Sequence, residues 1–311
     1  MTDHGHAEEL LAESRSLDAL RIADEALALS PADRRWLLLR LRALIALGRF
    51  ESALDFARIV SSRHPDDEHF AEVRTSLEAS VAAPQTTRHA VRSWESSIPP
   101  AMNRRLQKSI QAYRYRGLQM IKTPFDIALY LRLISEVRPG TVIEIGSKEG
   151  GSALFFGDLL ELNGGDGSIV SFDVFPVEDV RHPRVSFRFG DGQRLGDVIS
   201  SDDLARWRHP WVVIEDADHS FSTTHAVLEF FDAHLVPGDW IVIEDAVLSS
   251  TFPESFEDGI SGPERALRAF FARTSSRYRL ASEYCDFFGY NATANVNGYL
   301  EFVGSARYRS S

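Results

Sequence analysis

The sequence Val-Ile-Glu-Asp-Ala occurs twice in the chain, at residues 213–217 and again at residues 242–246. Each copy follows a tryptophan and a run of β-branched residues, which predicts a buried strand that ends in two carboxylates. No lysine or arginine lies close in the sequence to neutralise Asp216, Glu244 and Asp245, and burying unpaired charge is costly. Oxygen ligands of this kind suit Mg²⁺, with Mn²⁺ or Ca²⁺ as substitutes. If the two strands are parallel neighbours, the sequence predicts a divalent-cation site at their ends.

A histidine follows the first of these strands. His219 lies three residues beyond Asp216, and an imidazole accepts a proton near neutral pH, while a metal-bound hydroxyl releases one more easily. His219 is therefore a candidate general base; the alternative is that it only caps a helix that begins near Ser222. Asp218 competes with Asp216 as the first ligand, because a bulge could present either one. Asp216 is preferred because it has the same offset from its strand as Asp245.

Glycine-rich and acidic residues follow three earlier strands. The strand at 141–145 runs into Gly146-Ser-Lys-Glu-Gly-Gly-Ser152, whose spacing is not the one that seats a pyrophosphate, so a cofactor without phosphates fits better. Asp173 ends the second strand, where it could bond two ribose hydroxyls, and Gly190-Asp191-Gly192 ends the third, where it could meet an adenine edge. Such residues also form ordinary turns, but their recurrence at successive strand ends predicts a nucleoside site.

These residues need a framework of alternating strands and helices, which begins at residue 124. The expected strands are 141–145, 168–172, 185–189, 211–215 and 240–244, and the expected helices are 125–137, 152–162, 202–206 and 222–234. Apolar strands that alternate with helices predict a parallel sheet covered on both faces. Residues 280–288 and 298–303 predict a closing antiparallel hairpin. This α/β, Rossmann-like arrangement resembles class I S-adenosylmethionine-dependent methyltransferases.

A further helix is expected over residues 102–115, ahead of the sheet. Its arginines and tyrosines could line a substrate cleft or form a solvated face.

The first 80 residues have helical periodicity and contain an internal repeat. Ser30-Pro-Ala-Asp33 recurs 34 positions later as His64-Pro-Asp-Asp67, a period that resembles a tetratricopeptide unit; the alternative is a plain helical hairpin. About one and a half repeats favour docking to a protein partner, or self-association, over capture of an extended peptide. Residues 81–98 are rich in Pro, Ser and Thr and predict a linker. The expected domains are therefore an all-α domain over 1–80 and an α/β domain over 99–311.

The composition excludes several classes of protein. The chain of 311 residues is 44% hydrophobic, which is typical of a globular protein, and its net charge of −11 argues against nucleic-acid binding. No apolar run approaches the ~20 residues of a membrane span and the N-terminus lacks signal-peptide features, so we expect a cytoplasmic protein. The single cysteine, Cys285, excludes an internal disulfide and a multi-cysteine metal site and is expected to pack inside the strand at 280–288.

Several segments together resemble the cephalosporin hydroxylase family, which also contains rhamnosyl and macrolide-sugar O-methyltransferases. The resemblance covers roughly residues 110–303 and is carried by Lys122-Thr-Pro-Phe-Asp126 with Tyr130, Ile143-Glu-Ile-Gly-Ser147 with Gly150-Gly-Ser-Ala153, Asp216-Ala-Asp-His-Ser220 and Gly238-Asp-Trp-Ile-Val-Ile-Glu-Asp245. It implies that Asp216, Glu244 and Asp245 bind Mg²⁺ and that His219 is the general base. With the strand-end residues, it implies contacts to S-adenosylmethionine from Lys122, Glu144, Gly146, Ser147, Gly150, Ser152, Asp173, Asp191 and Asp216. Residues 249–264 correspond to a variable loop on the substrate side.

The leading interpretation is methyl transfer from S-adenosylmethionine to a hydroxyl of a sugar or another vicinal-diol compound, such as a natural product or a glycan. One alternative is a non-haem iron oxygenase, in which two histidines and one carboxylate bind the iron; His225 would be the second histidine. Another is a tetratricopeptide scaffold that carries an inactive methyltransferase domain. Glu215, the remaining carboxylate of the repeated sequence, has no expected role beyond solvation at the strand end.

Overall fold

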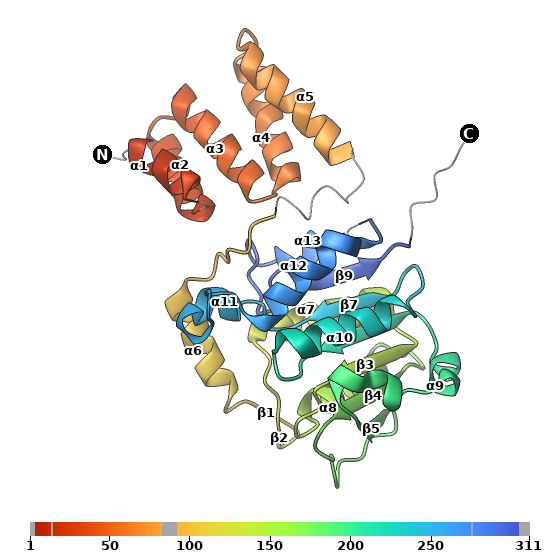
Figure 1. Cartoon of the computed structure of the whole chain (residues 1–311). Coiled ribbons are helices and arrows are strands. Elements are labelled where there is room, and N and C mark those ends of the chain that lie inside the picture. Colours follow the sequence, from red (N-terminus) through yellow and green to blue (C-terminus); the bar gives the residue numbers. More distant parts are fainter. Residues whose placement is uncertain (1–3, 14, 83–91, 275, 305–311) are drawn as a thin grey trace, which may run out of the picture. The chain divides into compact units, whose positions relative to one another are not determined.

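The chain divides into two compact units, Met1–Glu95 and Ser96–Ser311, shown in Figure 1. The computed structural model describes residues 4–13, 15–82, 92–274 and 276–304. Of the linker expected at 81–98, residues 83–91 lie outside the described residues, and residues 81 and 82 belong to the last helix of the first unit.

The second unit is built on a seven-stranded sheet with the order β5-β4-β3-β6-β7-β9-β8. Its strands are β3 (Thr141–Ile145), β4 (Ser168–Asp173), β5 (Val185–Phe189), β6 (Trp211–Glu215), β7 (Trp240–Ile243), β8 (Tyr278–Leu280) and β9 (Tyr299–Phe302). The first five strands in this order are parallel, whereas β9 runs antiparallel to β7 and β8. The predicted parallel sheet with a reversed C-terminal pair is therefore confirmed.

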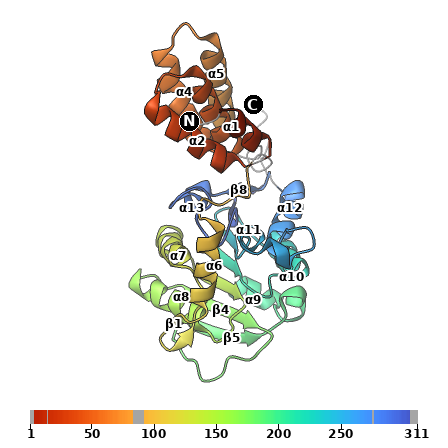
Figure 2. The same cartoon turned by 90° about the vertical axis from the view of Figure 1, so that its left-hand side faces the viewer.

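Helices cover both faces of this sheet, with α7 and α8 on one side and α10 and α12 on the other (Figure 2). The helical elements of the unit are α6 (Pro100–Ile110), α7 (Pro124–Val137), α8 (Gly151–Leu162), η2 (Gly192–Asp197), α9 (Ser201–Arg206), α10 (Phe221–Asp232), α11 (Leu248–Thr251), η3 (Pro253–Ser255), α12 (Gly262–Thr274) and α13 (Ser282–Cys285). Every residue of β3, β6 and β7 is buried, because these central strands are covered on both faces. Burial of these apolar runs is the main force that fixes the strand ends.

Two of the predicted elements are wrong in part. Helix α6 ends at Ile110, and the chain then forms a small antiparallel hairpin of β1 (Arg114–Tyr115) and β2 (Leu118–Gln119). Arg116 and Gly117 at its turn have φ angles of 51° and 88°, which no helix can contain.

The strand expected at 280–288 stops after Leu280, and α13 follows it. Cys285 is fully buried as expected, but it lies in this helix instead of a strand. Phe287 and Phe288 belong to the apolar pattern from which the strand was predicted. They are 56% and 45% exposed, so this pattern does not correspond to burial there.

The described residues of the first unit form five helices: α1 (His4–Ala12), α2 (Ser16–Leu29), α3 (Arg34–Ala46), α4 (Phe50–Arg63) and α5 (Glu68–Ala82). The small residues Ala19, Ala23 and Ala26 of α2 are buried, which lets neighbouring helices approach closely. In the described part of the chain, no helix combines the length and the apolar character needed to cross a membrane.

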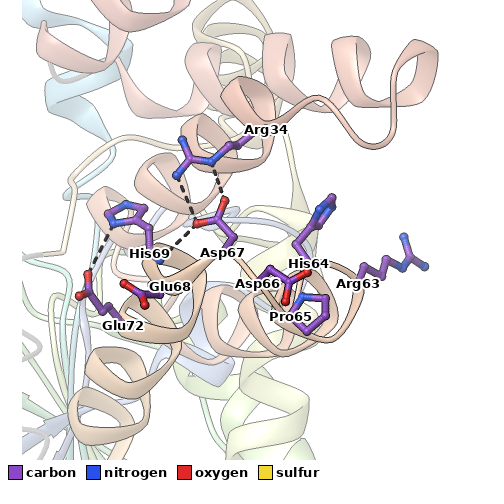
Figure 3. Close-up of a pocket in the computed structure, with 9 residues that line it drawn as sticks. All are labelled: Arg34, Arg63, His64, Pro65, Asp66, Asp67, Glu68, His69 and Glu72. Atoms are coloured by element: carbon purple, nitrogen blue, oxygen red, sulfur yellow. Dashed lines mark hydrogen bonds and ion pairs between the residues drawn. The ribbon is translucent and has the colours of Figure 1, made fainter.

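The repeated Pro-containing corners of this unit have the same backbone geometry. Asp33 N donates to Ser30 O and Asp67 N donates to His64 O, each at 3.1 Å. Figure 3 shows the second corner, where Asp67 accepts hydrogen bonds from the backbone N–H of His69 at 3.2 Å and from the guanidinium of Arg34 at 2.6 Å. The 34-residue sequence repeat therefore corresponds to a repeated structural unit.

Candidate active site

The carboxyl ends of the parallel strands surround a cavity of about 940 Å³. Nine of the residues predicted from the sequence as cofactor, metal or catalytic residues line it: Lys122, Gly146, Ser147, Ser152, Asp173, Asp191, Asp216, His219 and Asp245. The other three, Glu144, Gly150 and Glu244, do not line it. In an open α/β sheet this edge is the general location of ligand sites.

Three polar side chains converge where β6 and β7 end side by side. One ligand atom from each of Asp216, His219 and Asp245 lies within 4.8 Å of the others. His219 Nε2 is 3.4 Å from Asp245 Oδ2. Both residues have left-handed backbone conformations, with φ of 56° and 59°, which are costly for residues other than glycine. The pairing of β6 with β7 is parallel, so the expectation that the two repeated sequences end at one cleft is confirmed.

Glu244 lies behind this cluster and is only 3% exposed. Tyr130 on α7 donates a hydrogen bond of 2.6 Å from its hydroxyl to Glu244 Oε1. Lys122 Nζ lies 2.9 Å from the same oxygen and also forms an ion pair with Asp216. The counter-charge that the local sequence lacks therefore comes from a lysine 94 residues before Asp216.

Helix α7 begins directly after Lys122 and so fixes the position of this lysine. Thr123 is the N-cap, and its hydroxyl oxygen accepts a hydrogen bond of 3.2 Å from Asp126 N, while Pro124 occupies the first helical position. Burial opposes the charged form of Lys122, but the carboxylates of Asp216, Glu244 and Glu144 outweigh it and raise the pKa.

Negative charge remains in excess at this end of the cavity. Burial raises the pKa values of Glu244, Asp245 and Glu144, and the charge of Asp216 adds to the effect on Glu244. Burial also opposes the charged form of His219, but Asp245, Asp216 and Glu215 outweigh it and raise the His219 pKa above 6.5. Such an arrangement of buried charges is typical of a functional site.

Glu215 is fully buried, so the expectation that it is solvated is wrong. Its carboxylate accepts hydrogen bonds from Ala217 N at 3.2 Å and from Thr224 Oγ1 at 2.9 Å, which fasten the end of β6 to α10. Burial raises the pKa of Glu215 to about 7. Side chains of successive strand residues point to opposite faces, so Glu215 and Asp216 face different surroundings.

Asp216, and not Asp218, belongs to the cluster with His219 and Asp245. Asp218 lines the cavity but accepts a hydrogen bond of 3.0 Å from Ser220 N. Burial opposes the charged form of Asp218, but hydrogen bonds of this kind outweigh it and lower the pKa.

The second histidine required by an iron oxygenase lies outside this cluster. His225 on α10 is 4.0 Å from Glu229 and 3.3 Å from Arg273. Within the described residues, the strand-end cluster contains one histidine.

At the other end of the cavity, Asp173 connects two strand ends. Its carboxylate accepts hydrogen bonds from Lys148 N at 2.7 Å and from Phe175 N at 2.9 Å. Each carboxylate oxygen keeps a further lone pair for a ligand hydroxyl. Asp191 caps η2 by accepting a hydrogen bond of 2.9 Å from Gln193 N.

The loop after β3 packs closely against the end of β6. Gly146 has a φ of 110°, and a Cβ at this position would lie 2.0 Å from the carbonyl oxygen of Asp216. Only glycine therefore allows this approach. Gly150, with a φ of 87°, precedes the first residue of α8. Ser171 donates a hydrogen bond to the buried Glu144 and contacts Ser147, so the end of β4 holds the same loop.

Helix α6 and the segment after β7 form the remaining wall, which includes residues that the sequence did not single out. Gln107 Nε2 lies 3.4 Å from Asp245 Oδ1. Arg104 pairs with Glu254 at 2.7 Å and places its guanidinium 5.2 Å from the ring centroid of Phe252. Lys108, Gln111 and Leu248 complete this wall. Of the two alternatives for this helix, a cleft wall or a solvated face, Arg104 fits the first, although the helix is shorter than predicted.

Comparisons with known proteins find similarities for both parts of the chain. A sequence model of the family described as rhamnosyl O-methyltransferase/CmcI matches residues 107–303, and a tetratricopeptide repeat model matches residues 10–77. A rhamnosyl O-methyltransferase of Mycobacterium bovis (strain BCG / Pasteur 1173P2) is 26% identical over 195 residues, covering 60% of this chain and 76% of its own. The Mycobacterium leprae protein of the same name is 27% identical over 161 residues, covering 50% and 69%.

Solved structures include an apo form of CmcI, which is 25% identical with a TM-score of 0.47 and covers 63% of this chain and 78% of its own. The family match covers more than half of the chain, and the resemblance expected from the sequence is confirmed. The chain belongs to the rhamnosyl O-methyltransferase/CmcI family and is an S-adenosylmethionine-dependent O-methyltransferase of that type.

Proposed function

We propose that the protein methylates a hydroxyl group of a sugar, or of another small molecule with vicinal hydroxyls, and that a divalent cation and His219 assist the transfer. One observation carries the proposal: ligand atoms of Asp216, His219 and Asp245 lie within 4.8 Å of one another in the cavity that Asp173 and Asp191 also line. The name of the mycobacterial relatives, rhamnosyl O-methyltransferase, supports a glycosidic acceptor.

The chemistry of the donor set fits Mg²⁺, with Mn²⁺ or Ca²⁺ as substitutes. Asp216, Glu244 and Asp245 offer hard carboxylate oxygens, and their buried negative charge exceeds what Lys122 neutralises. These three residues would hold the cation. A bound cation would supply a Lewis acid that orients the acceptor oxygens and acidifies a hydroxyl.

His219 would remove the proton from the acceptor hydroxyl. Its Nε2 is the nitrogen that faces the carboxylates, 3.4 Å from Asp245 Oδ2, and would take the proton. Asp245 would then stabilise the charged ring, because opposite charges at this distance attract strongly in a partly buried site. The backbone of Asp216 and Ala217 packs against Gly146, so the strand end that leads to His219 lies against the loop after β3.

The predicted residues at the ends of β3, β4 and β5 would bind S-adenosylmethionine. Asp173 would bind the ribose hydroxyls and Asp191 would lie at the adenine end, while the loop that contains Gly146, Ser147, Gly150 and Ser152 would lie along the cofactor; Asp173 and Asp191 line the cavity, which supports these roles. Glu144 supports this loop from below through Ser171. We further propose that the tetratricopeptide-like helices bind a protein partner or a second copy of the chain.

A transfer assay with labelled S-adenosylmethionine tests the proposal. A panel of rhamnosides would be compared with matched deoxy-rhamnosides that lack one of two vicinal hydroxyls. We expect methylation of the intact diols in Mg²⁺, none in EDTA, and at least a tenfold loss for the deoxy compounds. Equal rates on both series, or full activity in EDTA, would show that the cation and diol roles are wrong.

A further inference from the structure

Lys122 occupies an unusual position for a lysine, because its amine is enclosed by carboxylates. The side chain is 1% exposed. Its Nζ is 2.9 Å from Glu244 Oε1 and forms an ion pair with Asp216, and Glu144 acts on its charge as well. An ammonium has three N–H donors, of which one is donated to Asp216, while the ion pair with Glu244 occupies a second side of the amine. Little of the amine is left to recognise a cofactor or an acceptor.

We infer that Lys122 is a positioning residue that sets the charge of the cation site. The inference rests on the proposed function above. Glu144, Asp216, Glu244 and Asp245 carry a formal charge of −4 when ionised, and Lys122 reduces it to −3. A divalent cation at the site reduces this remaining charge to −1. Lys122 also holds Asp216 and Glu244 together against their mutual repulsion, at the cost of weakening the attraction of the site for the cation.

Two substitutions at this position separate charge from packing. Lys122→Met removes the charge from a chain of similar length, and we expect the Kd for Mn²⁺ to fall at least about tenfold. Lys122→Arg keeps the charge, so its Kd is expected to stay within about threefold of the parent value. Lys108→Met is the matched control, since Lys108 lines the same cavity on the exposed face of α6. Isothermal titration of the metal-free full chain with Mn²⁺, without S-adenosylmethionine, gives these values.

A double variant tests the charge count directly. Lys122→Met combined with Glu144→Gln restores −3 while it keeps Asp216, Glu244 and Asp245, so its Kd is expected to return to within about threefold of the parent protein. If Lys122→Met alone does not fold, this double variant still tests whether Lys122 sets the charge of the cation site. Recovery of a folded double variant with the parent affinity supports the inference.

Three results would overturn it: an unchanged or weaker affinity in Lys122→Met, tighter binding in Lys122→Arg, or a double variant that fails to fold. Absence of Mn²⁺ binding by the parent protein is a different result, because it contradicts the cation assignment itself.

Discussion

The two units of the molecule differ in where their charged side chains lie and how they are paired. In the helical unit, exposed carboxylates form surface ion pairs with arginines, such as Asp24 with Arg40 and Glu8 with Arg42, at 2.6 and 2.7 Å. In the sheet unit, four buried or largely buried carboxylates, Glu144, Asp216, Glu244 and Asp245, surround Lys122. Exposed pairs are screened by water and salt, whereas buried excess charge destabilises the fold. A buried cluster of like charges that is kept despite this cost is typical of a functional site.

The largest expected effect comes from removing a carboxylate of the buried cluster. Asp216→Ala should lower methyl transfer by at least about a thousandfold and abolish its dependence on Mg²⁺, because it removes a proposed ligand that also contacts Lys122. Binding of S-adenosylmethionine, measured by titration calorimetry, should change only a few fold. Asp218→Ala is the matched control and should lose less than about tenfold. A larger loss of activity in Asp218→Ala than in Asp216→Ala would indicate that Asp218 is the ligand.

Removing the base should have the next largest effect. His219→Ala is expected to lower kcat by about a hundredfold or more. In the parent protein, kcat/KM should rise with pH through a pKa above 6.5, because the neutral ring accepts the proton and the neighbouring carboxylates favour its charged form. That limb of the pH profile should be missing in the variant. His225→Ala serves as the control and should change kcat less than about threefold; an unchanged profile in His219→Ala would contradict the base role.

A third experiment asks whether buried charge in the sheet unit lowers stability. Burial raises the pKa of Glu215 from 4.5 to about 7, so the folded protein keeps a proton there that the unfolded chain has lost. The free energy of unfolding should therefore fall as pH rises from about 4.5 to 7 and stay reduced above it. At pH 8, Glu215→Gln is expected to be more stable by at most about 3 kcal/mol, a difference that disappears toward pH 4.5.

Urea unfolding in EDTA over this pH range measures the difference. The control is Glu25→Gln in the helical unit, where Glu25 is the exposed partner of Arg21 and the substitution should change the free energy of unfolding by less than about 1 kcal/mol. A constant difference between Glu215→Gln and the parent at all pH values would mean that Glu215 acts only through its hydrogen bonds.

The smallest effect is expected in the helical unit. Arg42→Gln breaks an ion pair whose partners are 56% and 35% exposed, so Tm should change by at most about 2 °C and kcat should not change. Calorimetry and the transfer assay measure the two quantities. A fall in Tm of more than about 5 °C would contradict the expectation that exposed ion pairs of the helical unit contribute little to stability.

Most of the sheet could be predicted because its strands are long apolar runs. The expected ranges 141–145, 185–189 and 211–215 coincide with the observed strands. The errors lie at Arg114–Tyr115 and after Leu280, where a turn with positive φ and exposed aromatic residues break the periodicity. Local patterns fail where a short hairpin or a surface helix depends on distant contacts.

The candidate site was predictable in its residue types but not in its internal contacts. The strand-end position of Asp216 and Asp245 follows from sequence, and the parallel pairing of β6 and β7 brings them together. Tyr130 reaches Glu244 across 114 positions, and no local pattern indicates that contact. The same holds for Gln107 on α6, which lies beside Asp245.

By itself, the sequence determined which side chains stand at the strand ends, because apolar periodicity decides where each strand stops. Only the tertiary structure decided that Lys122 contacts Asp216 and Glu244 and that Glu215 faces Thr224. The physical reason is that the alternation of side chains assigns each carboxylate to a face, while the packing of α7 and α10 on those faces supplies its partner.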